Sequence, residues 1–136
     1  MEIRKFNAED YEKVFELWKK CNLSLGASDT KEEIIKFTKF NPETSLVGIH
    51  DNKIIGCVLG GYDGRRGLIH HLAIDPSYQK NGFGKELVIE LEKIFKSMGV
   101  IKISFWVLKN NLDVVDFYQK LGFELRNDMI TMSKVL

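Results

Sequence analysis

The sequence predicts an α/β domain in which a mixed β-sheet is flanked by about four helices, and three observations support this fold class. Two β-favouring segments, 45–50 and 53–62, are joined by the tight-turn pair Asp51-Asn52, which is typical of a β-hairpin. Segment 82–98 carries apolar residues at helical spacing. Segment 101–108 is an almost uninterrupted β-favouring run, which predicts a strand buried on both faces.

The N-terminal part of the chain predicts one strand and two helices. The strand covers Ile3 to Phe6, and Asn7 with Asp10 resembles a capping box that opens the first helix. A second helix begins at Asp29 or Thr30, after a loop. The first helix carries apolar residues on one face: Tyr11, Val14, Phe15, Trp18 and Cys21. Asn41-Pro42 ends the second helix, because a residue before proline disfavours the helical region.

The remaining elements follow in order. A further strand covers 68–74, a last helix covers 112–121, and segment 123–134 predicts a final strand or one half of a hairpin. No repeat or low-complexity linker interrupts this order. The whole chain, residues 1–136, is therefore expected to form a single domain.

Composition excludes several classes of protein. The chain is 44% hydrophobic and 29% charged with a formal net charge of +1, which gives no reason to expect a nucleic acid or a membrane as partner. Cys21 and Cys57 are too few for a disulfide framework and lack metal-ligand spacing, so reduced thiols and no metal are expected. The N-terminus has no apolar signal segment. These features predict a cytoplasmic protein.

A glycine-bearing turn between the strand 68–74 and the helix 82–98 is the most informative feature. It presents unpaired backbone N–H groups at the positive end of a helix dipole, an arrangement suited to phosphate oxygens. The Walker pattern fails because Gln79 and Glu86 stand where it requires Gly and Ser or Thr. The dinucleotide pattern fails at Leu87. What remains is Gln79-x-x-Gly82-x-Gly84; an ordinary turn before a capped helix is the alternative reading.

This turn resembles the Gln/Arg-x-x-Gly-x-Gly/Ala signature of the GNAT N-acetyltransferase superfamily. A second signature of that family, Asn-x-x-Ala-x-x-(Leu/Phe)-Tyr-x-(Lys/Arg)-x-Gly-Phe, is similar to the segment 111–123, in which Val114 replaces the usual Ala. The likeness extends in weaker form over nearly the whole chain. Segment 62–67 further resembles small stand-alone bacterial members, the YpeA-like group.

The resemblance implies a GNAT fold in which strands 4 and 5 splay apart and acetyl-CoA fills the gap. It implies an N-acetyltransferase that transfers the acetyl group to a primary amine of a small molecule or peptide by direct attack. The cofactor contacts that it implies are Leu72, Ala73, Ile74, Gln79, Lys80, Asn81, Gly82, Phe83, Gly84, Lys85, Asn111 and Tyr118.

Two catalytic residues follow from the resemblance. Tyr118 matches the family's motif tyrosine, whose hydroxyl protonates the leaving thiolate; a core or rim tyrosine is the alternative. Strand alternation places His70 with Leu68, Leu72 and Ile74 on one face and His71 on the other, and His70 is the candidate base. Leu68 replaces an acidic residue found in some members, and a packing histidine is the alternative for His70.

Other readings stay open at this stage. A GNAT fold that binds acyl-CoA without catalysing transfer is the main alternative, and a nucleotide-binding domain is a weaker one. Asn111 is expected to cap the last helix or to contact the cofactor. The acceptor is not specified by the sequence, and a homodimer is left open.

Overall fold

The computed structural model describes residues 1–136, which divide into two compact units, Met1–Phe105 and Trp106–Leu136. The second unit contains one helix, α4 (Asp113–Lys120). The elements of the first unit are, in chain order, β1 (Glu2–Lys5), η1 (Ala8–Asp10), α1 (Tyr11–Lys20), η2 (Ala27–Asp29), α2 (Lys31–Phe40), β2 (Ser45–His50), β3 (Lys53–Tyr62), β4 (Gly67–Ile74), η3 (Pro76–Tyr78), α3 (Phe83–Ser97) and β5 (Ile103–Ser104).

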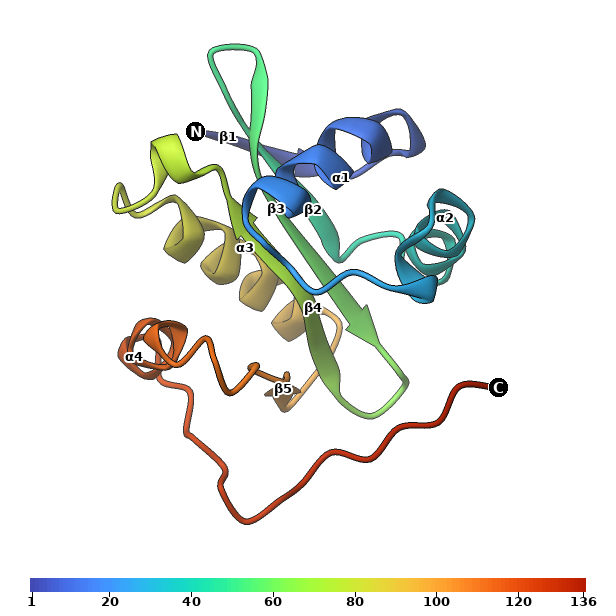
Figure 1. The fold of residues 1–136 in the computed structure, drawn as a ribbon, viewed down its shortest axis with the longest axis vertical. Helices are drawn as coiled ribbons and strands as arrows, with labels where there is room; N and C mark the ends of the chain where they lie inside the picture. Colours follow the sequence, from blue (N-terminus) through green and yellow to red (C-terminus); the bar gives the residue numbers. More distant parts are fainter. The chain divides into compact units, whose positions relative to one another are not determined.

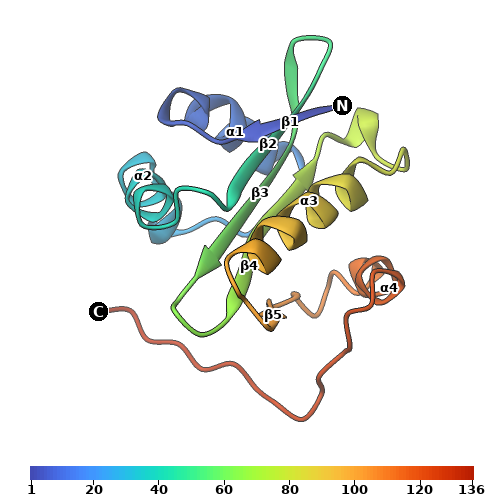
Figure 2. The ribbon, with the colours of Figure 1, turned by 180° about the vertical axis from the view of Figure 1, so that it is seen from behind.

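The first unit is built on a five-stranded sheet with the order β1-β2-β3-β4-β5. The first four strands pair antiparallel, whereas β4 and β5 pair parallel, so the sheet is mixed. Helices α1 and α2 cover one face of this sheet and α3 covers the other (Figures 1 and 2). The predicted fold class is confirmed.

Each face of the sheet has its own apolar core. On the α1/α2 face the fully buried Trp18 and Val14 pack with Cys57, Leu59 and Ala73 of the sheet. On the α3 face the buried side chains of the helix are Leu87, Val88, Leu91 and Phe95.

Glycine permits a close approach on the α3 face. A Cβ atom at Gly60 would lie 2.7 Å from Cδ1 of Leu91 and 2.6 Å from the carbonyl oxygen of Thr44, so only glycine lets helix and sheet pack this closely.

Several predicted boundaries hold because they rest on local chemistry. The capping box forms, with Asp10 Oδ2 accepting from the Asn7 N–H at 2.9 Å. Thr30 caps α2, its Oγ1 accepting from the Glu33 N–H at 3.3 Å. Strands β2 and β3 begin and end where the sequence predicts, since the turn residues between them both adopt left-handed backbone angles (φ +50° and +59°).

One predicted strand is much shorter and more exposed than expected, and another is absent. Segment 101–108 contains only the two-residue β5, and Ile101 is 93% exposed rather than buried. Segment 123–134 contains no strand. The reason is the same in both cases: β propensity yields a strand only where a neighbour supplies hydrogen bonds, and β4 pairs with just Ile103 and Ser104.

None of the helices combines the length and the apolarity needed to cross a bilayer.

Candidate functional site

The turn that leads from β4 into α3 is held in shape by its own side chains. Asp75 directly follows β4 and is the N-cap of η3. Its Oδ1 accepts a hydrogen bond from the Ser77 N–H at 2.9 Å. The Gln79 side chain donates to the carbonyl oxygen of Ile74 at 2.9 Å, and Asn81 donates to that of Tyr78 at 3.0 Å. Of the residues predicted at this turn, Gln79 and Asn81 therefore use their side-chain amides inside it.

The backbone N–H groups of the same turn have no acceptor within the chain. Lys80 and Gly82 both have left-handed backbone angles, with φ +64° and +81°. The first hydrogen bond of α3 joins the Glu86 N–H to the Gly82 carbonyl at 3.0 Å, and no N–H group from residue 80 to residue 85 donates to an acceptor of the chain. These donors lie at the positive end of a 15-residue helix, so the turn can bind phosphate oxygens.

The surroundings of these donors suit an anion. Lys80 and Lys85 are exposed, and neither forms an ion pair within the chain. A Cβ atom built at Gly82 would meet nothing within 4 Å, so the space above the turn is open. Phe83 and Gly84 form the first turn of α3 and complete the predicted set here.

Strand β4 leaves part of its backbone unpaired by β5. The register of β4 with β5 covers only Gly67 and Leu68. The Asp75 N–H donates to β3 at 2.8 Å, and in an antiparallel pair the main-chain groups point alternately toward and away from the neighbour. Leu72 and Ile74 therefore direct their main-chain groups away from β3, whereas those of Ala73 point toward it.

A β-bulge interrupts β4 at its two histidines. The pairing shifts between Val58 and Gly60, so that one β3 residue, Leu59, lies opposite both His70 and His71. Two residues opposite one is the definition of a bulge, and it breaks the side-chain alternation of a regular strand.

The bulge overturns the predicted faces of β4. The His70 ring lies 5.2 Å from that of Phe37 in α2, and the His71 ring lies 4.8 Å from that of Trp18 in α1. Both histidines therefore lie on the α1/α2 face, while Ile74 lies on the α3 face near Leu87. Regular strand alternation predicts opposite faces for the two histidines, because a single strand carries no signal for a bulge.

The two histidines have different environments. His71 Nε2 lies 2.7 Å from Oδ1 of Asp29, and the imidazole is 17% exposed. His70 has no polar partner among its contacts, and its side chain meets the edge of Phe37. Partial desolvation, together with repulsion from His71, lowers the pKa of His70 below its ordinary value of 6.5.

The sequence predicts Asp29 only as a possible helix start. Its Oδ2 accepts from the Gly26 N–H at 2.8 Å, and its carbonyl oxygen accepts from the Tyr11 hydroxyl at 2.6 Å. The contact with His71 spans 42 positions of the chain. No sequence signal could have found it, because the pairing depends on how the η2 loop packs on β4.

Two predicted residues belong to the second unit. Tyr118 lies on α4 and is 8% exposed, with its ring 5.0 Å from Phe117 and 5.5 Å from Phe123. Burial raises the pKa of the Tyr118 phenol, which keeps it protonated at neutral pH. The expected capping role of Asn111 is wrong: the N-cap of α4 is Leu112, and no side chain caps the helix there.

The chain is similar to known proteins over its whole length. A model of the acetyltransferase (GNAT) family matches residues 11–123. An acetyltransferase of Yersinia pestis (strain Pestoides F) is 37% identical and one of Sodalis glossinidius is 33% identical; both alignments cover all of this chain and 96% of the relative. The crystal structure of a PaiA N-acetyltransferase from Thermoplasma acidophilum in complex with coenzyme A is 24% identical, with a TM-score of 0.80 over 93% of this chain and 91% of that one.

Proposed function

The chain belongs to the acetyltransferase (GNAT) family, and on that premise we propose that it transfers the acetyl group of acetyl-CoA to a primary amine of a small molecule or a peptide by direct attack. The observation that carries this proposal is the turn from β4 to α3. Six successive backbone N–H groups without an acceptor, at a helix N-terminus and flanked by two unpaired lysines, fit a diphosphate. The PaiA neighbour, solved with coenzyme A, supports the same class of ligand.

The chain's residues fit the rest of this ligand as well. We assign the outward main-chain groups of Leu72 and the outward N–H of Ile74 to the arm of acetyl-CoA, with Ala73 between them, because the Ile74 carbonyl already accepts from Gln79. Asn111 is a further proposed contact. When bound, acetyl-CoA supplies an activated acetyl thioester. The backbone makes most of these contacts, so binding depends little on side-chain identity at the turn.

Three tasks then fall to the chain. The Leu72 N–H donates to the carbonyl oxygen as it gains negative charge. His70 takes a proton from the amine, since an alkylammonium with a pKa of about 10.4 is mostly protonated at neutral pH. The lowered pKa of His70 leaves its imidazole neutral, and so able to accept a proton, throughout the neutral range.

Tyr118 has the third task. Its hydroxyl donates to the leaving sulfur, and the raised pKa of the phenol ensures that the proton is present. A phenol with a raised pKa is a weaker acid than a thiol of pKa about 8.5, so the hydroxyl keeps its proton and stabilises the departing thiolate by a hydrogen bond, and the thiolate then takes its proton from solvent.

The decisive test is release of free thiol from acetyl-CoA against a panel of amino acids, polyamines, aminoglycosides and peptides with free N-termini. We expect release that depends on one class of amine. A protein that binds acetyl-CoA but releases no thiol with any amine would instead be a binding module. Thermal denaturation should show stabilisation by acetyl-CoA and not by ATP or NAD, because only a ligand that binds the folded state raises the melting temperature.

A pH–rate profile tests the base. With His70 intact, kcat/KM should fall on the acid side at a pH below 6.5, as the imidazole becomes protonated. His70→Ala should remove this acid limb. An unchanged profile in the variant would exclude His70 as the base.

A further inference from the structure

We propose that His50, the last residue of β2, is a positioning residue for the turn that leads from β4 into α3. The proposal rests on the proposed function, because it concerns the turn assigned to the diphosphate. Two aromatic contacts carry it: the centroid of the His50 ring lies 5.6 Å from that of Tyr78 and 5.8 Å from that of Phe83. Tyr78 is the last residue of η3 and Phe83 is the first of α3, so one side chain contacts both sides of the turn.

The sheet directs His50 toward this turn. Val47 of β2 belongs to the core under α1 and α2. Because side chains alternate along a strand, His50, three positions later, lies on the opposite face, which α3 covers. His50 pairs with Lys53 at the start of β3, and β3 pairs with the end of β4 at Gly56 and Ile74. The end of the β2–β3 hairpin therefore lies next to the place where the turn begins.

The hydrogen bonds of the turn do not connect its two sides. Gln79 and Asn81 donate their side-chain bonds only to carbonyl groups that precede them in the chain. On the helix side the first backbone bond returns to Gly82. No hydrogen bond joins residues 75–81 to α3, so the imidazole of His50 supplies a contact that the two sides share.

The conformation of the turn requires such support. Lys80 carries a side chain, yet its φ of +64° lies in the left-handed region that side chains rarely adopt. A residue keeps such a conformation only where the surrounding structure favours it over the alternatives. Without the contacts of His50 the turn could relax, and its free N–H groups would take up several orientations. A site that is ordered before binding has the higher affinity, so His50 strengthens phosphate binding without touching the phosphate.

An ion pair at the hairpin does not explain where His50 lies. Its Nε2 is 3.5 Å from Oδ2 of the neighbouring Asp51, and that carboxylate is 79% exposed. An exposed pair of this kind contributes little to stability. The two aromatic contacts, in contrast, join His50 to a segment that is distant in the sequence.

Two substitutions separate ring packing from the polar properties of His50. His50→Ala removes both, whereas His50→Phe keeps an aromatic ring and removes the ring nitrogens. We expect the dissociation constant for acetyl-CoA, measured by isothermal titration calorimetry, to rise about tenfold in His50→Ala and to stay at the wild-type value in His50→Phe. In the thiol-release assay the KM for acetyl-CoA should rise with it, while kcat at saturating acetyl-CoA is unchanged. Wild-type affinity in His50→Ala would overturn the proposal, and so would an equal loss in both variants, since a ring nitrogen would then be required.

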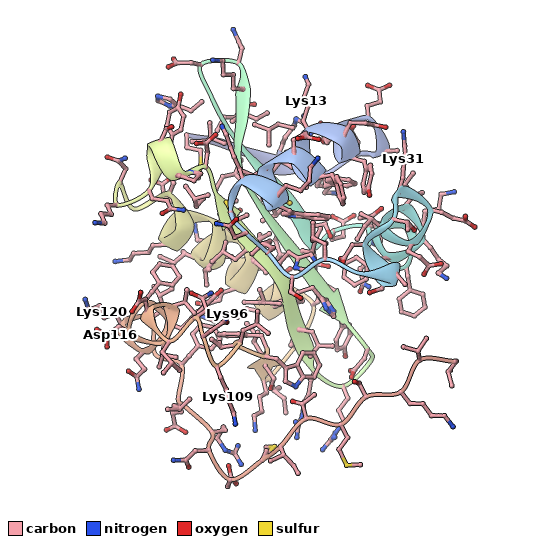
Figure 3. All side chains as sticks on the ribbon, viewed as in Figure 1. Lys13, Lys31, Lys96, Lys109, Asp116 and Lys120 are labelled. Atoms are coloured by element: carbon pink, nitrogen blue, oxygen red, sulfur yellow. The ribbon has the colours of Figure 1, made fainter.

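Phe15→Ala is a matched control for lost stability. Phe15 is a half-buried ring of α1 with two aromatic neighbours, whose centroids lie 5.6 Å and 6.4 Å away. It lies in the part of α1 that the ion pair between Glu12 and Lys31 joins to α2 (Figure 3). Phe15→Ala should lower the melting temperature but bind acetyl-CoA as the wild-type protein does. A loss of affinity equal to that in His50→Ala would overturn the proposal, because general destabilisation would then account for both.

A measurement on the ligand-free protein separates this proposal from the proposed function. The heteronuclear ¹⁵N–¹H NOE of the backbone N–H groups of residues 80–85 should be lower in His50→Ala than in the wild-type protein, because fast motion increases when the turn loosens. His50→Phe should restore the wild-type values. Unchanged values in His50→Ala would overturn the proposal. If the wild-type protein does not bind acetyl-CoA, the proposed function fails, while these values still decide whether His50 orders the turn.

Discussion

Alanine substitutions at the two ends of α3 offer a sharp test of the phosphate site. Gly82 before the helix and Gly99 after it have nearly the same left-handed backbone angle, φ +81° and +80°, and a Cβ atom at either would meet nothing within 4 Å. A side chain in this conformation costs about 1–2 kcal/mol. Gly82→Ala and Gly99→Ala should therefore lower the free energy of unfolding equally, which corresponds to roughly 3–6 °C in melting temperature for a chain of this size.

Ligand binding should separate the two variants. The Gly82 N–H lies among the donors assigned to the diphosphate, and an added methyl group at that position occupies space that the phosphate needs. We expect the dissociation constant for acetyl-CoA, measured by isothermal titration calorimetry, to rise at least about tenfold in Gly82→Ala, a loss of about 1.4 kcal/mol. Gly99→Ala should bind as the wild-type protein does.

Either of two results would refute this reasoning. Wild-type affinity in Gly82→Ala would mean that the turn does not hold the phosphates. An equal loss of affinity in both variants would mean that strain in α3, and not contact at Gly82, controls binding.

Three further predictions concern the reaction and the fold. Tyr118→Phe should lower kcat about 10²-fold in the thiol-release assay and leave acetyl-CoA affinity unchanged; a wild-type kcat would exclude the assigned role. Burial raises the pKa of Tyr118, so this residue should lower the free energy of unfolding only as pH rises through 10.0, the ordinary pKa of tyrosine. Gly60→Ala should lower the free energy of unfolding by about 2 kcal/mol in urea titrations, because the new methyl group overlaps Leu91, and a neutral effect would show that the two layers can separate without cost. Asp10→Asn should cost about 2 kcal/mol. Burial alone would raise the pKa of Asp10, but hydrogen bonds from Arg4 and the capping-box N–H hold it below 3.8, so its stabilising contribution should be present above that pH and be lost as pH falls below it.

Local chemistry explains which parts of the fold the sequence could predict. Strands β2 and β3 were predicted to the residue because a left-handed turn and strong β propensity both act over a few positions. The helix α3 and its N-terminal turn were found for the same reason, since Gly82 and the apolar spacing after it are local signals. The family motifs rest on equally local patterns.

The errors come from interactions between distant segments. A bulge exists only relative to the partner strand, so the face of His71 could not be deduced from β4 alone. The contact between His71 and Asp29 depends on how a loop packs on β4. Segment 101–108 has the composition of a long strand, but the sequence does not show that only two of its residues pair with β4. Asn111 carried the right side chain for a cap, but α4 begins after Leu112.

The extra residue in β4 lets two consecutive histidines share one face of the sheet. A regular strand turns consecutive side chains to opposite faces, so two consecutive histidines would put one imidazole into the hydrophobic layer under α3. If one of the two histidines were deleted, the remaining sequence from Leu68 to Ile74 would alternate without interruption and every apolar residue would keep its present side. The insertion therefore places both imidazoles on the α1/α2 face of the sheet while the hydrophobic layer under α3 is unchanged.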